Sequence, residues 1–548
     1  MINPLRRQID FKLSVLVILA AVGIQVHAQN ITFHCDKPYY FGGEFIFFNL
    51  FIPFIHTDST CVVNVHLGTG SQVVQRHYLL VSKSKATGHF KLPYDLPSDI
   101  YFIGADLIES KTNQAEQIFV RPISIYNTFK GNSGIEFPKV EFEGIQSKIE
   151  SGAITIHLPN RILTTRDSVQ CTIKVDQSSL NNSSITLSIA IRNKSLYQQT
   201  GRTIISDLAI VPSKSWIDRI PISGRRKLVS THAINNPLMG IAFSQGLRFE
   251  VASVRQEVFQ AAIPLFYGSQ YVEFIDYITD DFSIEVNTGP RPIHPTVAFN
   301  QDHKISDQLT LYEKRKMIYQ LYRTVDIQNE IIVNPSERPQ ISPNYEIDVK
   351  DFALRGTLLN LFKEVLAPLK FYRRKDGKHH ANILYDLAGV KTLHERPPLF
   401  IVNGRITRND IFISQLPIQD VSYIRIYSET DSIRRHFGVP GIYGIVEIEM
   451  IDKTYTLPEE VTLPGHVLDG LQPPFNYPIK VDRNAPHPLL KSLLYWNPSG
   501  RIDETGQFVF DFATSDDQSA FEIEVVAYRS DGTFALANQI FEVRKKWK

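Results

Sequence analysis

The sequence of 548 residues lacks several features that identify the class of a protein at once. It contains 3 cysteines and 4 methionines, and its 58 Lys and Arg residues balance its 57 Asp and Glu residues to a formal net charge of +1. So few cysteines exclude a disulfide-dense scaffold. The balanced charge gives no electrostatic reason to expect nucleic acid as a partner. Beyond the N-terminal leader, no apolar run reaches the ~18 residues of a membrane-spanning helix, so we expect no transmembrane segment in the mature chain.

Motifs of common enzyme classes are also missing. The chain has no G-x-S-x-G, no H-E-x-x-H and no P-loop pattern. His379 and His380 could suggest a metal pair, but adjacent residues of a strand face opposite ways and no carboxylate cluster is spaced nearby. We therefore expect a non-enzymatic protein with no catalytic residues, no metal and no cofactor. A hydrolase whose residues meet only in the folded chain is a remaining alternative.

The N-terminus has the pattern of a secretory signal peptide. A basic segment at 6–12 precedes an apolar segment at 13–26, and the residues VHA at 26–28 fit a small-residue cleavage site. We therefore expect residues 1–28 to be a signal peptide and the remaining chain to be exported.

Alternating apolar and polar residues are the main pattern in the rest of the chain. With 34 Phe and 23 Tyr, this alternation predicts short β-strands. Helices are expected only at 306–325 and 352–369. The buried face of the first helix is expected at Leu311, Ile318, Tyr322 and Val325.

Residues 34–53 have the sequence HCDKPYYFGGEFIFFNLFIP, which could form either a binding site or the first strands of a β-sandwich. Proline fixes φ, the paired glycines permit positive φ, and the aromatic residues fill one face of a sheet, so the stretch indicates strand, turn and strand. Its charged residues are expected to be solvated, as turn residues normally are. These residues are Asp36, Lys37 and Glu44.

This stretch and the segment GHFKLPYDLPSDIYFIGA at 88–105 closely resemble the second macroglobulin-like domain of alpha-2-macroglobulin relatives and of large exported proteins of Bacteroidetes-type bacteria. The pattern departs at Gly42, where Pro is usual. The motif is architectural in that family. The family's covalent trapping needs a Cys-Gly-Glu-Gln thioester, and none of the three cysteines here lies in such a run. The resemblance therefore implies sandwiches without trapping chemistry.

A second resemblance covers residues 396–452. The pairs Pro398-Leu399 and Asn403-Gly404, followed by VSYIRIYS and GIVEIEMI, resemble the plug domain of TonB-dependent outer-membrane receptors, although Asp is usual at Asn403. A receptor barrel needs on the order of 22 further strands, and only about 95 residues follow Asp452. We therefore expect a plug-like docking module and not a transporter.

The C-terminal segment at 494–512 resembles another macroglobulin segment, with Trp496 expected in its core. The expected fold class is therefore mainly β, with tandem macroglobulin or immunoglobulin-like β-sandwiches and an inserted α+β plug-like domain. The expected order is a signal peptide (1–28), a macroglobulin-like sandwich (29–127), a second such sandwich (146–213), a β-rich domain (214–300), a helical segment and linker (301–340), the plug-like domain (341–455) and a C-terminal macroglobulin-like sandwich (456–548).

These resemblances imply a non-enzymatic docking or scaffold component at the outer membrane, located in the periplasm or associated with that membrane. Its expected partner is an outer-membrane β-barrel protein or a larger envelope complex. The alternative is a surface adhesin or glycan-binding module of a nutrient-uptake system. The contact is expected on plug-domain loops at 403–410 and 427–441. Arg and aromatic residues are enriched in interface cores. The candidate contact residues of the second loop are therefore Arg434, Arg435, His436 and Phe437. Burial of Phe437 in the core is an equal alternative.

The cysteines give one further expectation. Cys35 and Cys61 lie in strand-like segments of the first expected sandwich, and an exported protein can form disulfides, so we predict that they pair. Cys171 would then be a small buried hydrophobic residue.

Overall fold

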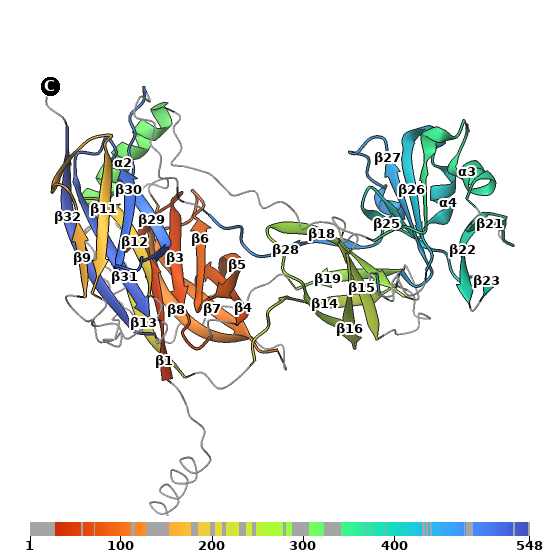
Figure 1. Cartoon of the computed structure of the whole chain (residues 1–548), viewed down its shortest axis with the longest axis horizontal. Coiled ribbons are helices and arrows are strands. Elements are labelled where there is room, and N and C mark those ends of the chain that lie inside the picture. Colours follow the sequence, from red (N-terminus) through yellow and green to blue (C-terminus); the bar gives the residue numbers. More distant parts are fainter. Residues whose placement is uncertain are drawn as a thin grey trace, which may run out of the picture. The chain divides into compact units, whose positions relative to one another are not determined.

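The chain forms a mainly β protein in two compact units (Figure 1). Unit 1 comprises residues 1–218, 290–331 and 474–548, and unit 2 comprises residues 219–289 and 332–473. Among the described residues, no helix is both long and apolar enough to span a membrane. Apart from short gaps, the computed structural model describes residues 28–127, 153–229, 237–287, 306–322, 341–475, 477 and 486–545.

The first sandwich of unit 1 is one ladder of strands in the order β13-β1-β3-β6-β5-β4-β7-β8-β2. Strands β5 and β6 pair only at their turn, Ser82 with Lys85, which lets the ladder fold into two layers. Its strands are β1 (Ala28–Cys35), β2 (Tyr40–Phe41), β3 (Phe45–Phe51), β4 (Thr60–Gly68), β5 (Val73–Ser82), β6 (Lys85–Lys91), β7 (Asp99–Ile108), β8 (Ala115–Tyr126) and β13 (Ile204–Ile210).

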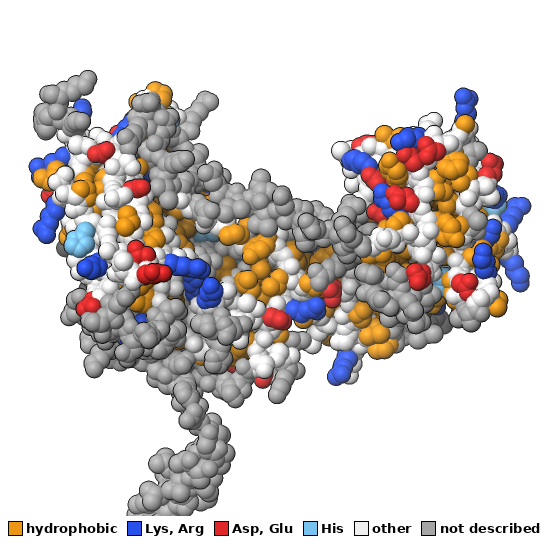
Figure 2. All heavy atoms as spheres, in the orientation of Figure 1, with side chains coloured by type: hydrophobic (Ala, Val, Ile, Leu, Met, Phe, Trp, Pro, Cys, Tyr) orange, Lys and Arg blue, Asp and Glu red, His pale blue; other side chains and the backbone are white. Residues whose placement is uncertain are grey.

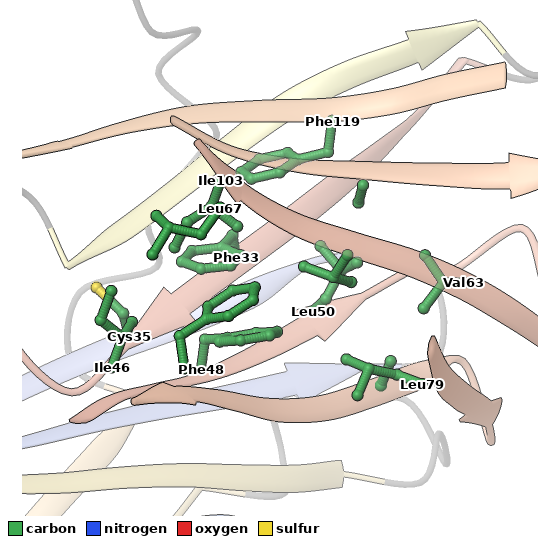
Figure 3. Packing of buried hydrophobic residues seen from close by; sticks show 14 of the residues in the cluster. Phe33, Cys35, Ile46, Phe48, Leu50, Val63, Leu67, Leu79, Ile103 and Phe119 are labelled. Atoms are coloured by element: carbon green, nitrogen blue, oxygen red, sulfur yellow. The ribbon is translucent and has the colours of Figure 1, made fainter. Parts of the chain in front are cut away.

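Aromatic side chains fill the core between these layers. The ring of Phe33 on β1 stacks on Phe48 of β3, with 5.4 Å between centroids, and on Phe119 of β8, with 5.2 Å. Figure 3 shows these rings pointing into one cluster with aliphatic residues of β4 and β7. Apolar residues that alternate along each strand thus meet on the inner face, as the sequence pattern predicts.

The second sandwich of unit 1 combines two distant parts of the chain. A sheet in the order β10-β32-β31-β12-β29 shares one core with a sheet in the order β30-β11-β9. Its strands are β9 (Ile154–His157), β10 (Ile162–Thr164), β11 (Ser168–Val175), β12 (Ile185–Asn193), β29 (Leu493–Arg501), β30 (Gln507–Ala513), β31 (Ala520–Arg529) and β32 (Phe534–Arg544).

This arrangement corrects the prediction of separate sandwiches at 146–213 and 456–548. Strand β11 pairs with β30, and β12 pairs with β31. Each segment therefore supplies strands that the other needs to bury its apolar faces. Short-range alternation identifies strands but does not show which distant strands pair.

The helix α2 (Ser306–Tyr322), expected from the sequence, also belongs to unit 1. Its buried face is not the predicted one, because Leu311 is exposed whereas the Tyr312 ring stacks on Phe41 at 3.9 Å. Arg315 is buried on the same side, where it forms an ion pair with a carboxylate of the second sandwich. A polar contact therefore helps to select the face that packs.

Unit 2 contains a sheet in the order β19-β14-β17-β16-β15-β18-β28. Its last strand, predicted within the C-terminal sandwich, instead pairs with β18, so the predicted boundary at residue 456 is wrong. The strands are β14 (Ile220–Leu228), β15 (Leu238–Phe243), β16 (Arg248–Arg255), β17 (Val258–Ile263), β18 (Ser269–Asp276), β19 (Phe282–Val286) and β28 (Gly465–Asp469).

The rest of unit 2 is an α+β domain, at the position predicted for the plug-like module. It has a sheet in the order β20-β26-β27-β24-β25 and a smaller sheet in the order β21-β22-β23. Its elements are β20 (Tyr345–Asp348), α3 (Leu358–Glu364), β21 (Leu369–Arg373), β22 (His379–Leu387), β23 (Val390–Leu393), β24 (Leu399–Val402), β25 (Arg405–Thr407), α4 (Asp410–Gln415), β26 (Val421–Tyr427) and β27 (Ile445–Met450).

The helix predicted at 352–369 is shorter in the structure. Gly356 has a φ of +107°, which a helix does not allow, and α3 begins only after Thr357. The predicted strands around 399–402, 421–427 and 445–450 are present.

Candidate functional site

The charged residues of the opening motif lie in the segment between β1 and β3. Asp36, Lys37 and Glu44 are at most 9% exposed, which corrects the expectation that they are solvated. The turn itself depends on Gly43, whose φ is +88° and whose position leaves no room for a Cβ, because that atom would lie 2.3 Å from the Tyr94 ring. The motif therefore forms a buried polar cluster.

Asp36 is held by donors from its own sandwich. The Tyr40 hydroxyl donates to its carboxylate at 2.5 Å, and the Phe47 backbone N–H donates to the same oxygen at 2.9 Å. Burial raises the pKa of Asp36 to about 6, although Lys37 and these donors oppose the shift.

Glu44 connects the first sandwich to the second. Its carboxylate accepts hydrogen bonds from Lys37 Nζ at 3.1 Å and from the Phe41 N–H at 2.9 Å, both within the motif. It also accepts from the hydroxyl of Tyr197 at 2.6 Å and, at 3.4 Å, from that of Ser492, and these two residues flank strands of the second sandwich. One carboxylate therefore bonds to both sandwiches.

A second buried carboxylate group surrounds Arg192 on β12. Its guanidinium donates to both oxygens of Glu524 at 3.0 Å and to Glu522 at 2.6 Å, and all three side chains are at most 4% exposed. Burial alone would raise the pKa of Glu524, but Arg192 and the hydrogen bonds from His34 and Arg192 hold it well below its ordinary value. The carboxylate therefore stays ionised inside the protein.

His34 on β1 brings the first sandwich to this group. Its Nε2 lies 3.0 Å from Glu524, and its Nδ1 lies 2.7 Å from the hydroxyl of Ser188. Burial lowers the pKa of His34, which outweighs the opposing effect of Glu524, so the ring is neutral at pH 7. From these partners we assign the proton to Nε2, which donates to the carboxylate, while Nδ1 accepts from the hydroxyl. The hydroxyl of Thr203, which precedes β13, also donates to Glu524 at 2.6 Å.

We call this set the sandwich joint, and it consists of His34, Asp36, Lys37, Glu44, Arg192, Thr203, Glu522 and Glu524. Lys37 and Arg192 offset part of the charge of its four carboxylates, and neutral hydrogen-bond donors satisfy the rest, in a region closed to water. Buried charges need such pairing, since an unpaired ion in a protein interior is strongly unfavourable. The arrangement therefore performs a structural task, holding two sandwiches together.

The predicted disulfide between Cys35 and Cys61 is not formed. All three cysteines are free and buried. The Cys35 thiol lies beside the sandwich joint, where it contacts Lys37 O at 2.9 Å and the Arg121 guanidinium at 2.9 Å. Strands β1 and β4, which carry the two residues, are separated in the ladder by β3, β6 and β5. The two cysteines therefore belong to the same sandwich, but their strands are not adjacent. Cys171 lies in the core of the second sandwich, as expected.

A second polar joint lies within unit 2. Glu273 on β18 accepts hydrogen bonds from Arg405 Nε at 3.0 Å and from the Ile406 N–H at 2.7 Å, and the Arg405 guanidinium lies 4.5 Å from the Tyr271 ring centroid. Arg408 donates to the carbonyl of Asp276 at 2.8 Å. The loop at 403–410, predicted to be an exposed contact loop, instead attaches the α+β domain to the neighbouring sheet.

Of the predicted contact residues in the second loop, 427–441, the structure describes only Phe437. Phe437 is fully buried, with its ring against Phe249 at 5.3 Å and Tyr427 at 5.5 Å, so it belongs to the core and not to an interface. Arg434, Arg435 and His436 lie outside the described residues.

The remaining candidates are also located. Trp496 is 6% exposed and packs in a cluster with Phe47, which confirms its assignment to a core. His379 contacts Lys363 Nζ at 3.3 Å, whereas His380 lies 3.3 Å from the Asp410 carboxylate. The adjacent histidines thus meet different partners.

Within the part of the chain that the structure describes, no group of three His, Cys, Asp or Glu residues is arranged to hold a metal.

Replacing Arg192 tests the sandwich joint. We expect Arg192→Met to lower the free energy of unfolding of unit 1 by about 3–5 kcal/mol, because Glu522 and Glu524 would be left buried without their cation. Urea unfolding monitored by tryptophan fluorescence measures this change. The matched control is Arg544→Met, which breaks a pair with Glu542 whose side chains are 61% and 50% exposed, and should cost at most about 1 kcal/mol. Equal losses in the two variants would contradict the assignment.

The joint of unit 2 predicts a pH dependence. Burial raises the pKa of Glu273 to about 7, above its ordinary value, although Arg405 and the Ile406 N–H oppose the shift. Because the pKa is higher in the folded state, the protonated group stabilises the fold. This contribution to the free energy of unfolding is complete below the unfolded pKa of about 4.3 and is lost as the pH rises through 7. We expect unit 2 of the wild type to lose about 3 kcal/mol from this group between pH 4.5 and pH 8. In the variant Glu273→Gln, the free energy of unfolding should fall less steeply with pH over this range. The same pH dependence in the variant and the wild type would refute the prediction.

Comparison with known proteins adds only broad likenesses. No protein-family model and no curated protein matches the chain. The solved structures similar to it include native Escherichia coli alpha-2-macroglobulin (8% identity, TM-score 0.24, covering 95% of this chain and 40% of that one). They also include Salmonella alpha-2-macroglobulin reacted with methylamine (9% identity, TM-score 0.23, covering 95% and 40%). The chain thus spans less than half the length of these structures, and with TM-scores this low their functions are not carried over to it.

Proposed function

We propose that this chain is a non-enzymatic component of the bacterial cell envelope that docks onto a larger complex. Unit 1 would act as a rigid support, and the plug-like domain of unit 2 would act as the docking module. Its partner would be an outer-membrane β-barrel protein or an assembly that contains one.

The observation that carries this proposal is that buried charged residues bond one domain to the next. Glu524 is closed to water and bonds to both Arg192 and His34. In unit 2, the buried Glu273 bonds to the partly exposed Arg405, which connects the plug-like domain to the adjacent sheet. Such pairs fix the relation between domains, which is what a scaffold requires.

The sequence supplies the support for location and partner. The expected signal peptide at 1–28 supports export, and the macroglobulin-like motif at 34–53 supports an envelope protein of the Bacteroidetes type. The plug-like pattern at 396–452 supports contact with outer-membrane machinery. The strands expected from that pattern, including β24 and β27, are present in one parallel pair at the centre of the sheet.

Site-specific photo-crosslinking in native cell envelopes tests the proposal. A photoreactive phenylalanine would replace exposed apolar residues of the plug-like domain, and matched positions in the second sandwich would serve as controls. The first set is Tyr345, Val390 and Ile451, and the control set is Val509 and Ile540, all of them at least 46% exposed.

We expect the first set to crosslink to one outer-membrane protein at several-fold higher yield than the control set. Equal yields from the two sets would contradict docking through the plug-like domain. Specific binding of oligosaccharides by the purified protein, together with no crosslinked outer-membrane protein, would instead favour the adhesin or glycan-binding alternative.

A further inference from the structure

The hairpin formed by β21 and β22 carries a concentrated positive charge. Its residues 369–380, LKFYRRKDGKHH, contain five Lys or Arg residues against one Asp, a formal charge of +4 in a chain whose total is +1. All five cationic side chains are exposed, and they are Lys370, Arg373, Arg374, Lys375 and Lys378. We call residues 369–380 the basic hairpin.

Hydrogen bonds close the basic hairpin, of which Asp376 lies outside the described residues. The Arg374 N–H donates to Lys378 O at 3.0 Å, and the Gly377 N–H donates to Arg374 O at 3.0 Å, which closes the turn. Arg373 Nε adds a side-chain bond to Gly377 O at 2.9 Å. At the base, Leu369 pairs with Ile383, and both side chains lie in the core of the domain. The cations are therefore displayed on a fixed support.

An aromatic residue lies among these cations. Tyr372 is 37% exposed, and the guanidinium of Arg374 lies 5.5 Å from its ring centroid. Tyr372 also donates its hydroxyl proton to Asn382 at 2.9 Å, so the ring is held in place. Tyrosine beside Lys and Arg is typical of surfaces at a membrane–water boundary, where the ring and the cations both reach the headgroup level.

The position of the hairpin is compatible with such a surface. Strands β21 and β22 lie at one edge of the α+β domain, and Figure 2 shows Lys and Arg side chains gathered there. The opposite side of the hairpin sheet faces the domain core through Phe371, whose ring stacks on Phe362 of α3 at 5.2 Å. Leu369 and Phe371 thus hold the hairpin in the fold, while its cations remain exposed along β21 and in the turn.

From these observations we infer that the basic hairpin binds the phosphate groups of an anionic lipid bilayer. The inference rests on the envelope location in the proposed function and adds a second contact to it. A bilayer presents phosphates as an extended plane, and such a plane can contact several exposed cations of β21 and of the turn after it at once. Each Lys or Arg near such a surface adds about a fivefold increase in partitioning at low salt.

Vesicle flotation with the purified mature chain tests this inference. We expect binding to vesicles that contain phosphatidylglycerol, little binding to pure phosphatidylcholine, and loss of binding as the salt concentration rises. The double variant Arg374→Gln and Lys375→Gln should reduce partitioning about 30-fold. Its matched control is Lys350→Gln with Lys453→Gln, which removes the same charge from exposed pairs elsewhere in the domain and should change partitioning by less than about threefold.

Three results would overturn the inference. They are equal binding to neutral and anionic vesicles, equal loss in the hairpin and control variants, and undiminished vesicle binding by the hairpin variant. Circular dichroism of each variant establishes that the fold is retained. The proposed function is tested separately, because the photo-crosslinking positions lie outside the hairpin. Crosslinking without vesicle binding would remove only the lipid contact, and vesicle binding without crosslinking would remove only the protein partner.

Discussion

The ion pair between Arg192 and Glu524 is the constraint on which unit 1 depends. Placing a carboxylate inside a protein is unfavourable unless a cation and hydrogen bonds compensate it. Here Arg192 supplies the cation from the second sandwich, while His34 and Thr203 supply donors from the first and from the segment that leads into β13. The carboxylate is satisfied only when both sandwiches are in place, so the pairing specifies how they associate.

Unit 2 uses the same principle at a smaller scale. Glu273 is buried in one sheet and satisfied by Arg405 and a backbone N–H from the α+β domain. In both units, polar groups at the joint specify which partner is accepted, while apolar cores such as the one around Phe33 stabilise each domain. Polar groups between domains and apolar groups within them therefore have separate tasks in this fold.

The sequence predicted the strands and the core better than the joints. Alternation along β31 agrees with the burial of Phe521, Ile523 and Val525, whereas alternation alone would put Glu522 and Glu524 on the opposite, solvated face. In the structure the first sandwich covers that face, so both faces of β31 are buried. Local pattern does not contain this information, because it depends on strands more than 300 residues apart in the chain. The same limit explains why the two halves of the second sandwich were predicted as separate domains.

A double-mutant cycle between His34 and Glu524 measures the central claim most directly, because these residues lie on different sandwiches and bond across the joint. The variants are His34→Leu, Glu524→Gln and both together, with the free energy of unfolding of unit 1 determined for each by urea unfolding. Residues in one buried network show coupling of about 0.5–3 kcal/mol, and we predict a value of at least about 1 kcal/mol. Additive effects, with a coupling near zero, would contradict the account that this bond joins the two sandwiches.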